Sequence, residues 1–358
     1  MSKASIFLSD EGYGHIVRQN AIAQELAKID SSLELQIITH GHLPMAKKLF
    51  TNAKFEDKYN NITWHKNKNG SPNLDLIEKH YSNYIPNTNK YIEEFPKLES
   101  DFIISDFVYE AFPLAQKNNI PGFGVAHFTW DWFFSKLYPP VLSSALIKHF
   151  IKQAELATKL YFPPFTPEEI LVHFKKKVIQ VPLIVRESPF LGKKIKDDRF
   201  KILIIDSGAI VLKESISKAS HQFPLLDDVL FLAMNSETQA TNISIIAQGE
   251  LLADYIPQVD LVIGRAGFNT ISECIAYRTP MLLLGEASNP EMSENIINLK
   301  KSGLGSFMSL EDFESNLVKF IPAFIKNEYK HLKTNMMDHE FELNGAEIIA
   351  HDILNSIK

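Results

Sequence analysis

The sequence predicts an α/β protein built from two doubly wound parallel-sheet halves, and three observations support that prediction. The 358 residues are enough for two domains at about 150 residues each. Short apolar runs alternate with helical patterns, as in strands joined by crossover helices. The alternation stops at a polar, basic stretch and then restarts. We therefore expect a domain over residues 1–187, a linker over 188–199 and a second domain over 200–358, with a cleft between the domains.

Compact apolar runs bounded by turn formers predict the buried strands of each half. Residues 16–29 predict a helix because Ile22, Leu26 and Ile29 recur on one face. The C-terminal segment is also helical by pattern, and it could pack back on the first domain. The expected strands are 5–8, 35–39, 102–105, 122–126, 201–205, 229–233, 243–247, 261–263 and 281–284; the expected helices are 16–29, 109–117, 268–277, 291–301 and 344–358.

Composition excludes several classes of protein. Lys and Arg number 37 against 43 Asp and Glu, and this mildly acidic balance argues against a general nucleic-acid binder. The one cysteine, Cys274, excludes a disulfide framework and a multi-cysteine metal site. No run reaches the ~18 apolar residues of a membrane helix, and the start of the chain does not read as a signal peptide. We expect a cytoplasmic protein without a metal.

A glycine-rich turn, SDEGYGHIVR at residues 9–18, follows the first predicted strand. Gly12 and Gly14 let the backbone approach a ligand closely, and the following helix presents unpaired N–H groups there. His15 is a candidate acid or base because it titrates near physiological pH. The turn is neither a full dinucleotide fingerprint nor a P-loop. On local sequence alone, a histidine that packs or caps the helix is the favoured alternative.

Asp106 stands at the carboxyl end of the strand over 102–105, so we expect it in the same crevice as His15. A carboxylate there would orient the imidazole and stabilise its cationic form. The alternative is that Asp106 caps the following helix.

Residues 260–273, DLVIGRAGFNTISE, predict a strand, a turn and a helix, which is the geometry that seats a diphosphate on a helix N-terminus. Glu273 lies one turn into the helix and could accept ribose hydroxyls, and Arg265 could offset phosphate charge. The alternative is an ordinary connection with an asparagine cap. The predicted amide donors are Gly267, Phe268, Asn269 and Thr270.

Polar side chains follow the next strand, at residues 286–295, where they could bind sugar hydroxyls. The alternative there is a solvated loop with Pro290 starting a helix. We expect three other features to have structural roles. Cys274 packs, the pair His40 and His42 lacks a third metal ligand, and the aromatic cluster over 128–134 belongs to the core, with acceptor contact as its second interpretation.

Residues 260–305 resemble the nucleotide-binding half of the inverting GT-B glycosyltransferases, and the bacterial peptidoglycan N-acetylglucosaminyltransferases are closest in pattern. Residues 9–26 look like the N-terminal glycine-rich loop of that family. Residues 105–134 and 178–186 are similar to the glycosyltransferase-like portion of L-arabinokinases, whose kinase domain is missing here. The resemblance implies two Rossmann-like domains that face a cleft.

The resemblance also implies roles for particular residues. His15 matches the catalytic base and Asp106 its acidic partner, while Glu273 matches the glutamate that holds the ribose. Met292 stands where a glutamine is common, which leaves the donor sugar open. The remaining implied donor-site residues are Arg265, Gly267, Phe268, Asn269 and Thr270 on the diphosphate, Glu291 and Asn295 on the sugar, Ser207 and Gly208 in a shortened glycine-rich loop, and Gly12 and Gly14 in the N-terminal loop.

These observations together predict a metal-independent, inverting transfer of a sugar from a nucleotide diphosphate, most simply UDP, to a hydroxyl acceptor. No cofactor is expected. A nucleotide-sugar hydrolase or 2-epimerase on the same fold, and a non-catalytic nucleotide-sugar binding protein, stay open as alternatives. The sequence leaves open the sugar, the acceptor, the oligomeric state and peripheral contact with the cytoplasmic face of a membrane.

Overall fold

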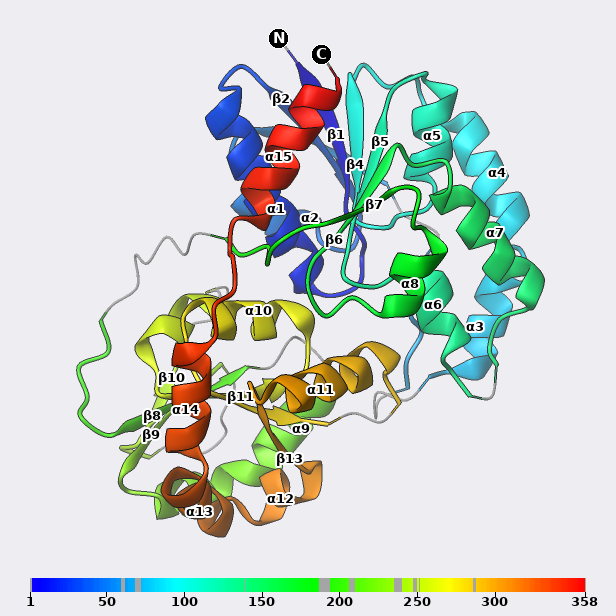
Figure 1. Cartoon of the computed structure of the whole chain (residues 1–358). Helices are drawn as coiled ribbons and strands as arrows, with labels where there is room; N and C mark the ends of the chain where they lie inside the picture. Colours follow the sequence, from blue (N-terminus) through cyan, green and yellow to red (C-terminus); the bar gives the residue numbers. More distant parts are fainter. Residues whose placement is uncertain are drawn as a thin grey trace. The chain divides into compact units, whose positions relative to one another are not determined.

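The computed structural model divides the chain into two compact units, each built around its own parallel sheet (Figure 1). The first unit comprises Met1–Asn67, Pro72–Arg186 and Glu342–Lys358, and the second lies within Glu187–Phe341. The prediction of two parallel-sheet α/β halves is confirmed. The structure describes residues 2–58, 62–67, 72–138, 140–186, 194–205, 210–234, 240–246, 250, 252–285 and 288–357. Residues 188–193 of the predicted linker lie outside this range.

Within the described residues, the first unit holds a seven-stranded sheet of order β3-β2-β1-β4-β5-β6-β7 in which every pairing is parallel. The central strands are buried on both faces, as in other parallel sheets covered by helices. Its strands are β1 (Lys3–Phe7), β2 (Glu34–Thr39), β3 (Ala53–Asp57), β4 (Phe102–Ser105), β5 (Gly122–Val125), β6 (Lys159–Phe162) and β7 (Val178–Gln180). Its helices are α1 (Tyr13–Ile29), α2 (Leu43–Leu49), α3 (Leu74–Tyr81), α4 (Tyr84–Glu94), α5 (Ala111–Lys117), α6 (Trp130–Ser135), α7 (Ser144–Ala154), α8 (Glu168–His173) and α15 (Gly345–Ser356).

The second unit repeats the plan with a six-stranded parallel sheet, again counted over the described part of the chain, of order β10-β9-β8-β11-β12-β13. Its strands are β8 (Phe200–Ile205), β9 (Val229–Ala233), β10 (Ile243–Ile245), β11 (Leu261–Arg265), β12 (Met281–Leu284) and β13 (Ser306–Met308). Its helices are α9 (Ile210–Ala219), α10 (Phe268–Ala276), α11 (Pro290–Ser302), α12 (Leu310–Ser315), α13 (Leu317–Asn327) and α14 (Tyr329–Asp338), with 3₁₀ turns at Ser220–Leu225 and Leu252–Gln258.

Four of the five predicted helix starts differ from the structure, and the two largest differences, at α1 and α5, flank the candidate base and its partner. α1 begins at Tyr13 rather than at residue 16, so His15 lies in the first turn of the helix and not in a loop. Gly12 is the residue before the helix, and its φ of 76° lies in the region that glycine tolerates best. α5 begins at Ala111 rather than at residue 109, and Phe107, just before it, has a positive φ of 52°.

The C-terminal helix α15 packs on the first unit, beside α1 (Figure 1). Ile349 and Ile353 belong to the same buried cluster as Ile16 and Leu26 of α1. The Asp352 carboxylate accepts hydrogen bonds from Lys159 Nζ at 2.8 Å and Tyr161 Oη at 2.6 Å on β6. The chain thus leaves the first unit after β7 and comes back to complete its core.

A short antiparallel pairing fixes the point of return. Leu183 N donates to Glu342 O and Gly345 N donates to Leu183 O, both at 3.1 Å. The approach is so close that a Cβ on Gly345 would lie 2.2 Å from the carbonyl oxygen of Pro182. Only glycine fits where two backbones come this near.

Gly345→Ala tests this contact. The added methyl group meets backbone rather than a movable side chain, so we expect the free energy of unfolding to fall by about 1–3 kcal/mol, as for other overpacked sites. Gly305→Ala is the matched control, since its Cβ would make ordinary contacts of 3.5–3.6 Å. The measurement is urea unfolding of both variants. Equal stability of the two variants would show that the α15 junction adapts to the methyl group.

Candidate functional site

The first unit gathers its polar site at the carboxyl ends of β1 and β4, which are neighbours in the sheet. Phe7, the last residue of β1, pairs with Ser105, the last residue of β4. Asp106 follows directly and its backbone N–H donates to Phe7 O at 3.0 Å. α1 starts only a few residues beyond β1, so the sheet register itself brings Asp106 next to the first turn of α1.

The loop between β1 and α1 is fixed by its two acidic residues. Asp10 Oδ1 accepts hydrogen bonds from the Thr39 hydroxyl at 2.9 Å and from the backbone N–H groups of His40 and Gly41 at 3.1 and 2.8 Å. Glu11 Oε1 accepts from Trp64 N at 2.6 Å. Each carboxylate therefore ties the loop to a different neighbouring connection, so the start of α1 is held in place.

His15 and Asp106 form the pair that the sequence predicts. His15 Nδ1 bonds Asp106 Oδ2, and the His15 side chain is 14% exposed while the Asp106 side chain is fully buried. The alternative that Asp106 caps the following helix is wrong, because the capping position of α5 is Glu110. With Nδ1 engaged, the other ring nitrogen, Nε2, is the one left for chemistry.

Two further side chains bond Asp106 and a third, His127, lies beside one of them; the sequence interpretation gave none of the three a role. Arg18 bonds Asp106 Oδ1, and Gln19 Nε2 donates to the same oxygen at 3.3 Å. Arg18 Nη1 also lies 3.3 Å from Nδ1 of the buried His127. The signal that could have found Arg18 and Gln19 is their spacing, three and four residues after His15, which puts them on the same helix face. His127 follows β5, next to β4 in the sheet.

Electrostatics keep Asp106 ionised despite its burial. Burial alone would raise the pKa of this carboxyl group, but the positive charge of Arg18 and the contact with His15 outweigh it and lower the pKa to about 2. Nearby, burial and then the closeness of His15 lower the pKa of His42. The site therefore holds the ionised carboxylate of Asp106 beside the His15 imidazole.

The second unit shows the predicted strand, turn and helix. β11 ends at Arg265, Gly267 is the capping position of α10, and the backbone N–H groups from Phe268 onward begin the helix. The backbone of Gly267 is ordinary, with a φ of −75°, and a Cβ there would meet nothing within 4 Å. The open space above Gly267 is what a ligand that approaches the backbone needs.

Two residues of α11 reach this turn. Glu291 Oε1 accepts a hydrogen bond from Phe268 N at 3.4 Å, so a carboxylate sits at the amino end of α10. Asn295 Nδ2 donates to Ala266 O at 2.8 Å and is buried, so it fastens the turn to α11. Asn289 caps α11 by accepting from Met292 N at 3.1 Å. The predicted residues Glu291 and Asn295 are thus brought to the predicted turn.

The other predicted donor-site residues lie along α10 and β11. Asn269 and Thr270 are partly exposed in the first turn of α10, whereas the Phe268 and Glu273 side chains are buried. The alternative of an asparagine cap on α10 is wrong, since Gly267 takes that position. Ser207 and Gly208 lie outside the described residues.

The structure buries Cys274 and the aromatic cluster over 128–134, as expected for core residues. Cys274 is buried, and burial, together with the nearby Glu273, raises the pKa of its thiol, so it is a poor nucleophile. His40 Nδ1 bonds Asp57 Oδ1 at 2.6 Å. Among the described residues, no group of three or more metal-ligating side chains occurs. Phe128, Trp130 and Trp132 belong to a buried aromatic cluster, as expected for core.

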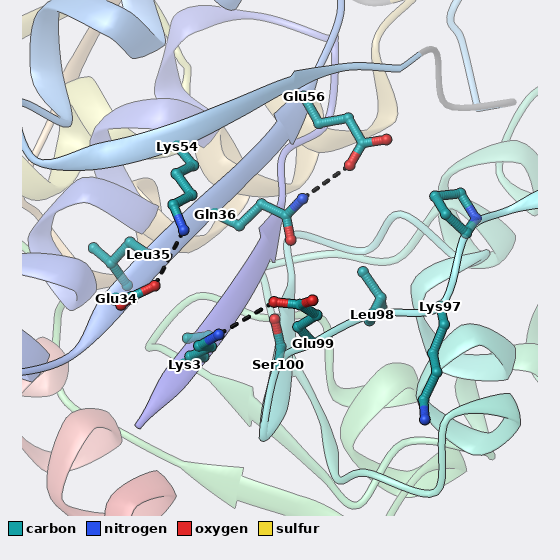
Figure 2. Close-up of a pocket in the computed structure, with 12 residues that line it drawn as sticks. Lys3, Glu34, Leu35, Gln36, Lys54, Glu56, Lys97, Leu98, Glu99 and Ser100 are labelled. Carbon is teal, nitrogen blue, oxygen red and sulfur yellow. Dashed lines mark hydrogen bonds and ion pairs between the residues drawn. The ribbon is translucent and has the colours of Figure 1, made fainter. Parts of the chain in front are cut away.

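A cavity of about 250 Å³ lies at the opposite end of the first sheet, near the amino ends of β1 and β2 (Figure 2). Most of its polar lining groups are paired with one another: Lys3 with Glu99 at 3.2 Å, Lys54 with Glu34 at 3.2 Å, and the Gln36 amide with Glu56 at 2.9 Å. The cavity therefore offers a ligand few unsatisfied groups, and it is remote from the His15 site.

No helix in the described part of the chain combines the length and apolar character needed to cross a membrane.

Comparisons with known proteins point in one direction. Residues 225–353 match the Glycosyltransferase family 28 C-terminal domain. The chain is 28% identical over 173 residues to the UDP-N-acetylglucosamine–N-acetylmuramyl-(pentapeptide) pyrophosphoryl-undecaprenol N-acetylglucosamine transferase of Clostridium perfringens, an alignment that covers 43% of this chain and 48% of that protein. The chain thus spans about half the length of this curated relative.

Solved structures match over the whole chain. The spinosyn rhamnosyltransferase superposes with a TM-score of 0.66 at 13% identity and covers 99% of this chain and 100% of its own. The glycotransferase of kitacinnamycin gives a TM-score of 0.62 at 13% identity, covering 99% and 98%. At this identity the likeness shows the fold, which is that of GT-B glycosyltransferases, and the family resemblance stated from residues 260–305 is confirmed.

Asp106→Asn gives a pH test of the buried carboxylate. Because folding lowers the pKa of Asp106 from 3.8 to about 2, its ionised form stabilises the folded first unit by about 2 kcal/mol above pH 4, and this contribution is lost as the pH falls toward 2. The stability difference between wild type and Asp106→Asn should therefore be constant from pH 7 to 5 and shrink below pH 4.

Urea unfolding followed by tryptophan fluorescence measures this difference, since Trp64, Trp130 and Trp132 all lie in the first unit. Asp75→Asn, at an exposed position in α3, controls for the loss of any carboxylate. A difference that keeps its size down to pH 2.5 would mean that folding does not lower the pKa of Asp106.

Proposed function

Since residues 225–353 form a Glycosyltransferase family 28 C-terminal domain on a chain with the GT-B fold, we propose that the protein is a glycosyltransferase that moves a sugar from a nucleotide diphosphate to a hydroxyl acceptor. The observation that supports this best is the His15–Asp106 pair, a partly exposed imidazole oriented by a buried carboxylate at the carboxyl end of the first sheet.

The first unit supplies the base. With Nδ1–H donated to Asp106, Nε2 carries a lone pair that can accept the hydroxyl proton of the acceptor. The acceptor oxygen then forms a bond to the anomeric carbon while the bond from that carbon to the diphosphate oxygen breaks. This single displacement inverts the configuration at the anomeric carbon. The proton ends on His15 and the electron pair leaves with the diphosphate.

The second unit supplies the leaving-group site. Charge builds up on the diphosphate as the bond breaks, and the amide groups at the start of α10 are placed to stabilise it. Thr270 and Asn269 add side-chain donors in the same turn, and Glu273 lies one turn further on for a ribose. In this mechanism backbone amides do the work that a metal does elsewhere, so no metal or other cofactor is required.

The finer features of the proposal rest on the relatives and on chemistry. A UDP-linked donor is favoured by the curated relative, whose name contains UDP-N-acetylglucosamine. A lipid-linked acceptor, and with it peripheral contact with the cytoplasmic face of a membrane, is suggested by the pyrophosphoryl-undecaprenol in the same name. Met292, buried in the first turn of α11, gives the donor site an apolar group there.

His15→Gln should separate binding from chemistry. Loss of the base should lower the transfer rate by about 10²–10⁴-fold, while UDP still raises the melting temperature as in wild type. Thr270→Ala combined with Glu273→Ala should abolish that thermal shift. His221→Gln, at an exposed position of the second unit, is the control.

The same assay without acceptor tests the alternatives. A transferase leaves the nucleotide sugar largely intact, whereas a hydrolase or 2-epimerase consumes it at full rate. Should His15→Gln keep wild-type turnover in every assay, the proposed base is wrong. If wild type turns over no nucleotide sugar with any acceptor yet binds UDP, the binding-protein alternative holds.

Glu291→Ala tests what the Glu291 carboxylate does at α10. In the ligand-free site it occupies the Phe268 N–H and places a negative charge where a diphosphate would bind. Its removal should tighten the binding of UDP several-fold, because like charges repel. The binding of a UDP-sugar should tighten less or weaken, since the carboxylate would then be needed for the sugar hydroxyls.

Isothermal titration of UDP and UDP-N-acetylglucosamine provides the measurement. Glu294→Ala, one residue of like charge in the same helix, is the matched control. Weaker binding of UDP itself to Glu291→Ala than to wild type would contradict the assignment of this helix end to the diphosphate.

A further inference from the structure

Arg18 is a buried arginine beside the proposed base, and the reaction as written does not use it. Its side chain is 2% exposed. It lies one helical turn after His15 and makes its ion pair with Oδ1 of Asp106, while His15 bonds Oδ2 of the same carboxylate. Arg18 Nη2 also comes within 3.2 Å of His15 Nδ1. One carboxylate is thus shared between a permanent cation and the imidazole.

The charges in this cluster decide where a proton rests. Asp106 contributes one negative charge and Arg18 one positive charge, so the buried pair is neutral before His15 is considered. A proton added to His15 would leave the cluster with a net positive charge at the edge of a low-dielectric interior. In a pair of histidine and aspartate without the arginine, the same proton would instead neutralise a buried anion and be held tightly.

The groups around the ring do not reverse this balance. The Nδ1 atom of the buried His127 lies 3.3 Å from Arg18 Nη1. His42, from the start of α2, lies near enough for His15 to affect its pKa. The acidic residues Asp10 and Glu11 are bonded to Thr39 and its neighbours and to Thr63 and Trp64.

We propose that Arg18 is a positioning residue for the base: by neutralising Asp106 inside the first unit, it keeps His15 as a neutral imidazole with a proton on Nδ1 and an available lone pair on Nε2. The part of this proposal that concerns catalysis rests on the proposed function. The part that concerns the protonation state of the His15 ring does not depend on that function. Arg18 also holds Oδ1, so that Oδ2 faces His15.

The ¹⁵N spectrum of histidine-labelled protein at pH 7 tests the proposal. In wild type we expect His15 to show one protonated and one unprotonated ring nitrogen. In Arg18→Met the carboxylate has lost its permanent partner, so both nitrogens of His15 should be protonated. Arg18→Lys restores a positive charge and should restore the neutral ring at least in part. Arg18→Met with Asp106→Asn removes both charges and should also give a neutral ring.

A wild-type spectrum with both His15 nitrogens protonated overturns the proposal without any variant, so it stays testable if Arg18→Met fails to fold. An unchanged neutral ring in folded Arg18→Met overturns it as well, and would leave Arg18 a purely structural role. With a transfer assay, Arg18→Met should lower kcat at pH 7 by at least about 10-fold with little change in the donor KM. If His15→Gln transfers normally while the spectra behave as expected, the proposed function fails and the inference about Arg18 stands.

Discussion

The buried carboxylate of Asp106 is the constraint on which the first unit's site depends. An ionised group with no exposure is costly unless it is paired and hydrogen-bonded. Here the carboxylate is paired with His15 and Arg18, which lie in one turn of α1. The backbone N–H of Asp106 donates a hydrogen bond to Phe7 O on the adjoining strand. The need to satisfy this anion therefore fixes the rotation of α1 relative to β4. The orientation of the His15 imidazole is set by the same hydrogen bond to Asp106.

The second unit meets a related problem with backbone instead of side chains. The amino end of α10 has N–H groups with no partner inside the helix, and the protein covers the first of them with a carboxylate from α11. Asn295 fastens the turn from the other side through the Ala266 carbonyl. The turn is thus preorganised by α11 while the space above Gly267 stays open. Preorganised amides of this kind are effective at stabilising charge that develops during a reaction.

Sequence patterns predicted nine of the strands because parallel strands buried on both faces are short, apolar and bounded by turns, and β4, β8 and β12 have this form. The strands β3, β6, β7 and β13 were not predicted. The pairing of His15 with Asp106 could be predicted as well, since neighbouring parallel strands deliver their following residues to one edge. Arg18 and His127 could not be recognised in the same way. An arginine on a helix is usually exposed, and its burial here follows from a carboxylate 88 positions later in the chain.

Helix starts were less predictable, because they depend on single backbone angles. The starts of α1 and α5 differ from the prediction by three and two residues, and the positive φ of Gly12 directly before α1 is information that no periodic pattern contains. The role of Asn295 was also hidden. A buried amide that holds a carbonyl and a surface amide that binds a sugar look alike in the amino-acid sequence.

The place of α15 has a consequence for how the protein is made. Residues that complete the buried cluster around α1, such as Ile349 and Ile353, are among the last of this chain to be synthesised, although α1 is among the first. During translation the apolar face of α1 must wait uncovered while the whole second sheet is produced and has time to fold. We therefore expect the N-terminal unit to complete its core only after the second sheet has been synthesised, and to be the unit that is open to aggregation in the interval.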